Sequence, residues 1–111
     1  MKLSEERYND VVVISLEGSL MGGPEAVSLN EAVNRLLDEG MYKLVINLEN
    51  VERMNSSGLG ILIKALSTFK SNGGDLKLAS LSPKIDNLLH ITKINTILES
   101  YDTIEAAVNS F

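Results

Sequence analysis

At 111 residues, the chain has room for one folded domain but not for two independent cores. It contains no cysteine, which excludes disulfides, thiolate metal ligands and cysteine nucleophiles. Its formal net charge is −5 and none of its 10 basic residues adjoins another, which excludes the basic patch of a nucleic-acid-binding protein. No stretch resembles a signal peptide or a membrane span, so we expect one cytoplasmic domain over residues 1–111, with no membrane partner.

The start of the chain predicts two strands and a helix. Residues 11–16 (VVVISL) are mostly β-branched and apolar, which is typical of a strand buried on both faces. We expect residues 3–8 to pair with this strand in antiparallel fashion, across the Asn-Asp turn between them. A helix then begins at Pro24, where the missing N–H costs nothing, and ends at Gly40, which can adopt the left-handed conformation of a helix stop.

Strands and helices alternate along the rest of the chain. The predicted elements are a strand at residues 43–48, a helix at 56–71, a strand at 76–81, a helix from Ser82 and Pro83, a strand at 97–100 and a final helix. Asp102 and Glu105 suit a capping box for the last helix, whereas Glu49 and Glu52 look like solvated loop charges. This order predicts an α/β domain with a small mixed sheet, opened by a hairpin and packed with about four helices.

Two glycine-rich stretches suggest nucleotide binding, but their spacing does not fit it. Gly58 and Gly60 stand at a predicted strand-to-helix turn, yet Ile63 occupies the position of the third glycine of the dinucleotide fingerprint. The stretch 18–23 is followed by Pro-Glu instead of the Lys-Ser or Lys-Thr pair of a phosphate-binding loop. Tight turns and helix ends explain both stretches better, so we expect no nucleotide and no other cofactor.

The sequence contains no evident catalytic constellation. Ser56 and Ser57 both lack the glycine two residues upstream that a nucleophile elbow requires. His90 is the only histidine, and we expect it to be partly buried or at the rim of a helix, because its neighbours are apolar. A single histidine without cysteines does not suggest a zinc site. We therefore predict neither an enzyme nor a metal protein.

The two adjacent serines allow two interpretations. Ser56 and Ser57 stand where a helix begins, and serine is a preferred N-cap because its oxygen accepts a first-turn N–H bond. On chemistry alone, capping is the favoured interpretation. The alternative is modification, since a helix N-terminus stabilises negative charge by ~0.3–1 kcal/mol and can hold a phosphate. Gly60 and Lys64 lie on the predicted exposed side, and a glycine there, costing ~1 kcal/mol of helix propensity, suggests close approach by a partner's backbone.

A family resemblance adds to this interpretation. Residues 44–63 read LVINLENVERMNSSGLGILI, and this segment resembles the anti-sigma-factor antagonists of bacterial partner-switching systems, the STAS-domain family. The likeness extends to NGGDLKLASLSP at residues 72–83 and to LLHITKINTIL at residues 88–98. It implies a small α/β domain, in agreement with the predicted order of elements.

The resemblance also implies a phosphorylation switch. In the family, the first serine of Asp-Ser-Ser-Gly-Leu-Gly is phosphorylated by the partner anti-sigma factor, which is a serine kinase; the matching residue here is Ser56. The unphosphorylated form binds the kinase and frees the sigma factor, and a PP2C-type phosphatase resets the switch. Two residues depart from the pattern, since Asn55 replaces the aspartate and Met21 stands where many members carry an acid. The alternative is therefore a STAS module that binds a partner or a small anionic ligand without being phosphorylated.

The loop at residues 18–23 and the helix starting at Ser56 should lie at the same edge of the sheet, because both follow the carboxyl ends of buried strands. We predict that a partner binds there. The predicted binding residues are Met21, Gly22, Gly23, Asn55, Ser56, Ser57, Gly58, Gly60 and Lys64. We expect the protein to be a monomer or a weak dimer.

Overall fold

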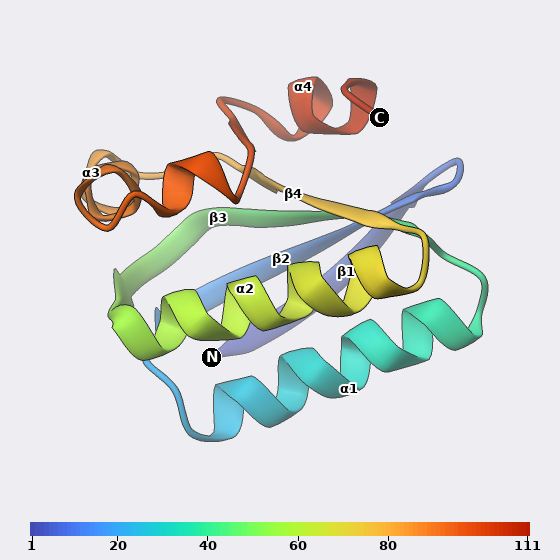
Figure 1. Ribbon diagram of the computed structural model, residues 1–111, viewed down its shortest axis with the longest axis horizontal. Helices are drawn as coiled ribbons and strands as arrows, with labels where there is room; N and C mark the ends of the chain where they lie inside the picture. The colour runs from blue at the N-terminus through green and yellow to red at the C-terminus, as the bar shows by residue number, and fades with distance from the viewer.

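A five-stranded mixed sheet organises residues 1–111, all of which the computed structural model describes (Figure 1). The strands lie in chain order: β1 (Lys2–Tyr8), β2 (Val11–Leu20), β3 (Lys43–Met54), β4 (Asp75–Ala79) and β5 (Ser100–Tyr101). The helices are α1 (Pro24–Asp38), α2 (Ser56–Ser71), α3 (Pro83–Ile91) and α4 (Ile104–Asn109). β1 and β2 form an antiparallel hairpin, and every other neighbouring pair is parallel. The predicted fold class, a mixed sheet opened by a hairpin and packed with four helices, is confirmed.

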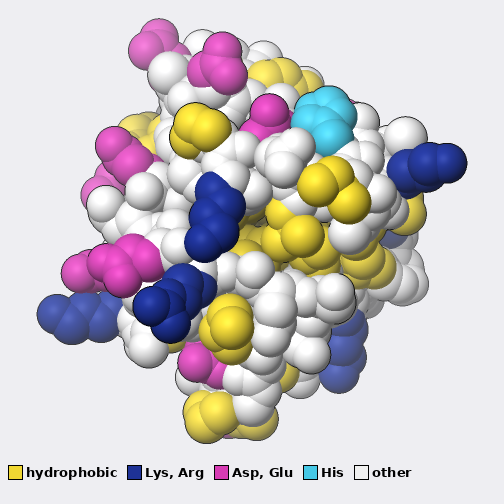
Figure 2. Space-filling view, turned by 90° about the vertical axis from the view of Figure 1, so that its left-hand side faces the viewer, with side chains coloured by type: hydrophobic (Ala, Val, Ile, Leu, Met, Phe, Trp, Pro, Cys, Tyr) yellow, Lys and Arg dark blue, Asp and Glu magenta, His cyan; other side chains and the backbone are white.

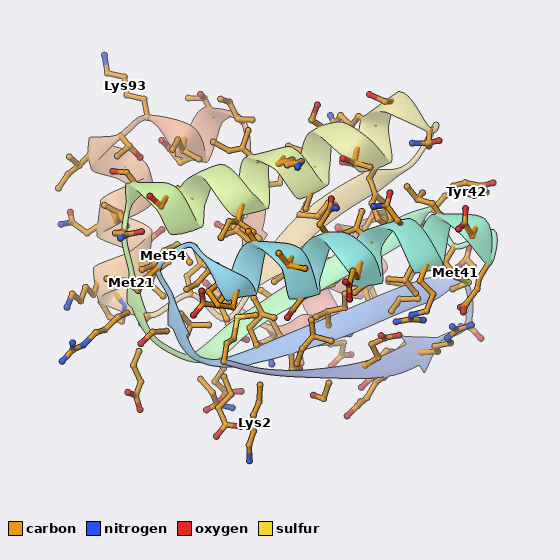
Figure 3. The ribbon with its side chains drawn as sticks, turned by 90° about the horizontal axis from the view of Figure 1, so that it is seen from below. Lys2, Met21, Met41, Tyr42, Met54 and Lys93 are labelled. Carbon is orange, nitrogen blue, oxygen red and sulfur yellow. The ribbon has the colours of Figure 1, made fainter.

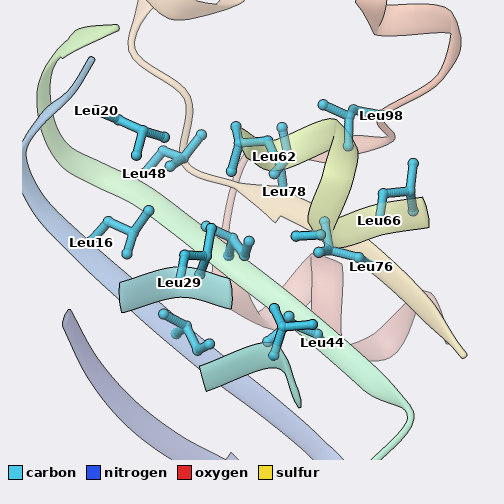
Figure 4. Packing of buried hydrophobic residues seen from close by; sticks show 14 of the residues in the cluster. Leu16, Leu20, Leu29, Leu44, Leu48, Leu62, Leu66, Leu76, Leu78 and Leu98 are labelled. Atoms are coloured by element: carbon cyan, nitrogen blue, oxygen red, sulfur yellow. The ribbon is translucent and has the colours of Figure 1, made fainter. Parts of the chain in front are cut away.

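The two faces of the sheet are covered unequally. In Figure 1, α1 and α2 run side by side beneath the sheet, and α4 lies above it. The core on the α1–α2 side contains 22 buried residues, and Figure 4 shows its leucines filling the space between strands and helices. The core under α4 contains only Val11, Val13, Val45, Ala79 and Ala107. The larger core therefore fixes α1 and α2 against the strands that precede them, and with them the loops at the carboxyl edge of the sheet.

Two strands are longer than predicted. β2 continues past residue 16 to Leu20, and β3 continues past residue 48 to Met54. Glu49 and Glu52, which we expected in a loop, therefore lie in β3 and are exposed. The β2–β3 pairing along this extension contains two irregularities, one of them at Gly18, whose φ of 105° is a left-handed value. Such bulges break the period-two pattern of burial, so the extension carries no alternation that a sequence pattern could reveal.

The carboxyl-terminal part also differs from prediction. β4 ends at Ala79, short of the predicted residue 81, because Ser80 has a left-handed φ of 59°. Of the predicted strand at residues 97–100, only Ser100 lies in a strand, the two-residue β5, and a 3-10 turn at Ile94–Thr96 precedes this segment. Leu98 lies between them with 1% of its surface exposed, so this segment is held by one core side chain more than by strand pairing.

The N-cap of the last helix lies one residue later in the chain than predicted. Thr103, not Asp102, is the N-cap of α4, and its Oγ1 accepts a hydrogen bond of 3.0 Å from the backbone N–H of Ala106. Both residues are acceptable caps. The predicted capping box with Glu105 is therefore wrong, although the predicted helix is present.

Candidate binding surface

Asn55 forms the start of α2. Its side-chain Oδ1 accepts a hydrogen bond of 2.9 Å from the backbone N–H of Gly58, while its backbone is extended. The serines are therefore not the caps, and the capping interpretation of Ser56 and Ser57 is wrong. Both serines are exposed in the first turn, and neither hydroxyl makes a hydrogen bond. The asparagine takes the role that either serine was expected to fill.

The first turn of α2 packs directly against the backbone at the end of β2. A Cβ atom on Gly58 would overlap the carbonyl oxygen of Leu20 and lie 2.9 Å from its carbonyl carbon. Only glycine fits there, because the contacting atoms are backbone and cannot rotate away. The predicted binding residue Gly58 is thus buried and positions the surface from beneath it.

The loop after β2 lies against the same turn. Gly22 and Gly23 have φ values of 107° and 70°, a conformation that favours glycine. A Cβ atom on Gly22 would be only 3.2 Å from the Cβ of Ser57. The chain thus brings the predicted loop residues and the predicted helix residues together at one edge of the sheet.

Two methionines lie side by side at this edge. Figure 3 shows Met21 and Met54 next to one another where β2 and β3 end. Met21 is 42% exposed, although it is a large apolar residue. On the outer side of α2, a Cβ atom added to Gly60 would have no neighbouring atom within 4 Å, and Lys64 is exposed, as predicted. The surface is therefore open to an incoming molecule at both Met21 and Gly60.

Helix N-termini contribute positive potential at this edge, although the first turns of α1 and α3 contain Glu25 and Asp86. α1, α2 and α3 all begin here, and each helix contributes a partial positive charge at its N-terminus. The first turn of α2 contains no acidic residue. A negative charge placed on Ser56 would accordingly meet a favourable field and no neighbouring carboxylate within that turn.

The other candidate residues lie apart from this surface or form no cluster. His90 is exposed, not partly buried as one alternative had it, and its Nε2 lies 3.5 Å from the Oδ1 of Asp86. Nowhere in residues 1–111 do three side chains of histidine, cysteine, aspartate or glutamate come together as metal ligands would. None of the four helices has both the length and the apolar composition needed to cross a membrane.

A groove next to Met54 was not predicted. It separates the end of β3 from α3 and has a volume of ≈ 200 Å³. It is lined by Glu52, Met54, Lys84, Ile85, Asn87, Leu88 and Ile91. One signal in the sequence pointed to it, since Ile91 ends an amphipathic helix but falls outside the stripe formed by Ile85 and Leu89, the two buried residues of α3.

Known sequences resemble this chain over most of its length. The family model described as the STAS domain matches residues 2–107. A candidate anti-sigma factor antagonist of Thermotoga maritima is 32% identical over 75 residues, which are 68% of this chain and 66% of the relative, just under two-thirds of that protein. The anti-sigma F factor antagonist of Paenibacillus polymyxa is 25% identical over 105 residues, covering 92% of this chain and 87% of the relative.

Solved structures share the fold. The crystal structure of a candidate anti-sigma factor antagonist from Thermotoga maritima has a TM-score of 0.87 at 28% identity, covering 97% of this chain and 92% of the other. The phosphorylated form of the Bacillus cell fate determinant SpoIIAA has a TM-score of 0.73 at 20% identity, covering 98% of each chain. At that identity the second likeness establishes the fold alone.

Proposed function

Because this chain belongs to the STAS domain family, we propose that it is an anti-sigma factor antagonist: in its unmodified form it binds an anti-sigma factor and so frees a sigma factor. The names of its relatives support the first part of this proposal. We further propose that the anti-sigma factor is a serine kinase that phosphorylates Ser56 and that a PP2C-type phosphatase reverses the modification. The protein itself is not an enzyme in this scheme and acts in the cytoplasm.

The observation that carries the proposal is the position of Ser56. Its side chain is exposed in the first turn of a helix whose cap is already made by Asn55. The hydroxyl is therefore free to act as a nucleophile toward the γ-phosphorus of ATP held by the kinase, with ADP as the leaving group and loss of the hydroxyl proton. Ser57, in contrast, lies against the loop at Gly22 and has less room for a phosphate.

Phosphorylation would change the surface and leave the core intact. A phosphoserine adds about −1.5 to −2 charge at pH 7. The buried residues of α2, which include Leu59, Leu62 and Phe69, face the sheet and would not move. A partner shaped to fit the neutral hydroxyl would have to desolvate the phosphate charge, so the complex should dissociate while the domain stays folded.

The test is a phosphorylation assay with the purified host kinase and ATP, followed by intact-mass analysis. We expect one added phosphate, and Ser56→Ala should abolish it. Ser57→Ala is the matched control and should still accept one phosphate. Phosphate that persists on Ser57 in Ser56→Ala would contradict the assignment of the acceptor.

A second function is favoured by the departures from the family pattern. Asn55 caps α2 without the negative charge of an aspartate, and Met21 replaces an acid in the adjoining loop. A STAS module that binds its partner or a small anion without being phosphorylated could carry both substitutions. Tight binding of an anti-sigma factor together with no phosphate transfer in the assay above would favour this second function.

A further inference from the structure

The groove between β3 and α3 is a binding feature that the proposed switch leaves unused. Its apolar walls are Met54, Ile85, Leu88 and Ile91, and its polar lining is Glu52, Lys84 and Asn87; we call this set the β3–α3 groove. Figure 2 faces this end of the molecule. It shows a hydrophobic hollow near the centre of the face with lysine and arginine side chains beside it.

The groove exposes an apolar side chain, Ile91, that is not needed to hold α3 against the core. Ile91 is 69% exposed, more than any other large hydrophobic side chain that the protein leaves exposed. α3 is already anchored by Ile85 and Leu89, which are 2% and 1% exposed. Covering Ile91 and the neighbouring walls would remove this surface from water, which favours association with an apolar side chain of another molecule.

The groove is continuous with the surface around Ser56. Met54 lines the groove and also touches the first turn of α2, since its Cγ lies 3.0 Å from the place of a Cβ on Gly58. Met21 lies beside Met54 in Figure 3. A partner that covers Ser56 and Met21 would therefore reach the groove without changing its orientation.

The charges beside the groove favour an acidic occupant. Lys84 lines it and forms no ion pair within the chain, whereas Arg7 and Arg35 do. The N-termini of α2 and α3 add positive potential at the same edge. Glu52 is the only acid in the lining. Lys84 therefore remains available to a carboxylate of another molecule.

We propose that the β3–α3 groove is the second half of the docking surface and takes an apolar side chain of the anti-sigma factor, whose neighbouring carboxylate pairs with Lys84. This inference rests on the proposed function, because it assigns the groove to the same partner. It adds the chemical class of the contact, a segment that is both apolar and acidic. It also explains release, since a phosphate on Ser56 would repel a carboxylate bound beside it.

The test is calorimetric titration of the unmodified chain and its variants with the purified anti-sigma factor of the host. Ile91→Asp and Lys84→Glu should each weaken binding about tenfold or more, as expected for an anchor residue and a charge contact in an interface. Ile97→Asp and Lys93→Glu are the matched controls. Ile97 is 53% exposed and Lys93 is exposed, and neither lines the groove, so both variants should bind within about twofold of wild type.

Salt dependence separates a charge contact from an effect on folding. Wild-type affinity should fall as salt rises, and the affinity of Lys84→Gln should fall less steeply, because one screened pair is missing. If wild type binds and the phosphorylated form is released, yet Ile91→Asp and Lys84→Glu bind like wild type, the groove inference is wrong and the proposed function stands. If unmodified wild type does not bind the anti-sigma factor at all, the proposed function fails, and the groove inference fails with it.

Discussion

The charged side chains at one end of the sheet form ion pairs, and several of those at the other end do not. At the end where β2 and β3 begin, charges are paired: Lys43 contacts Asp10 at 2.7 Å, and Arg7 bridges β1 to Glu39 at the end of α1. Figure 3 marks this end by Met41 and Tyr42. These contacts join segments that are distant in sequence, so their role is within the fold.

At the end where β2 and β3 finish, two basic side chains have no partner in the chain. Arg53 and Lys84 form no ion pair, and Met21 and Ile91 expose apolar surface. His90 and Asp86 pair with each other, but only within α3. The same end contains the N-termini of three helices. The comparison indicates that one end is satisfied internally and the other is available to a partner, and the following predictions separate the two roles.

The largest effect should come from Gly58, where the first turn of α2 packs against the end of β2. Gly58→Ala places a Cβ against the backbone carbonyl of Leu20, so we expect the free energy of unfolding to fall by ~3 kcal/mol or more. Urea denaturation followed by circular dichroism would measure the change.

Gly60→Ala is the matched control for that substitution. Gly60 lies in the same helix but has nothing within 4 Å of its Cβ position. Alanine there should stabilise the protein by up to about 1 kcal/mol, because it is the better helix former. Equal stability of Gly58→Ala and wild type would show that α2 does not rest on β2 as described.

The next largest effect should be that of phosphorylation on binding. A loss of ~3 kcal/mol at the interface corresponds to a fall in affinity of more than a hundredfold. The melting temperature should change by only a few degrees, because the phosphate on Ser56 meets the favourable end of the α2 dipole, an interaction worth at most ~2 kcal/mol. Calorimetric melting and titration of both forms would measure the two quantities separately.

Ser56→Asp provides a graded version of this experiment. It should weaken binding less than the phosphate does, because aspartate has less charge and fewer acceptor oxygens. A large drop in melting temperature on phosphorylation would argue against a surface mechanism. Unchanged affinity would favour the module that is not switched by phosphorylation.

A smaller effect is expected from single substitutions on the open surface. Met21→Arg and Gly60→Arg should each weaken binding of the anti-sigma factor about tenfold, because a bulky side chain would stand within a fitted contact. Both side chains would point into open space, so thermal stability should stay nearly unchanged.

Tyr42→Arg is the control from the opposite end. Tyr42 is 47% exposed, close to the 42% of Met21, but it lies where the strands begin. Its substitution should leave binding unaffected. If binding tolerates Met21→Arg and Gly60→Arg but is lost in Tyr42→Arg, the interface lies at the opposite end of the sheet, where the strands begin, and the proposed surface is contradicted.

Much of the fold could be predicted because its signals are local. Buried strands form apolar runs, proline marked the starts of α1 and α3, and glycine followed the ends of α1 and α2. The bulged extensions of β2 and β3 escaped prediction because pairing across a bulge depends on the neighbouring strand. The strand predicted at residues 97–100 was misplaced, because the two residues of β5, Ser100 and Tyr101, pair with β4 without forming a pattern of their own.

The binding surface was predictable only in part, for a similar reason. Asn55, Ser56 and Gly58 lie within four residues of one another, so a strand-to-helix junction and a family resemblance were enough to propose them. The β3–α3 groove joins Met54 to Ile91, and its existence depends on where α3 packs. The position of Ile91 outside the buried stripe of α3 indicates exposure, but only the packing shows that it lines a groove with Met54.

The smallest effect concerns the paired end and depends on pH. A hydrogen bond from Arg7 lowers the pKa of Glu39 below its ordinary value, with Arg35 assisting. A carboxyl group with a lowered folded-state pKa stabilises the protein above its unfolded pKa of about 4.3, and this contribution is lost as the pH falls through the folded pKa. Glu39→Gln should therefore lower the melting temperature slightly at pH 7 and approach the wild-type value at pH 3. The effect should stay small because the pair is exposed to solvent and screened by salt.

Glu31→Gln is the control, an exposed change in α1 at a residue without an ion pair, and it should show no such dependence on pH. A difference between Glu39→Gln and wild type that persists or grows in acid would mean that Glu39 acts through packing, and the contrast between a paired and an open end would lose its electrostatic basis.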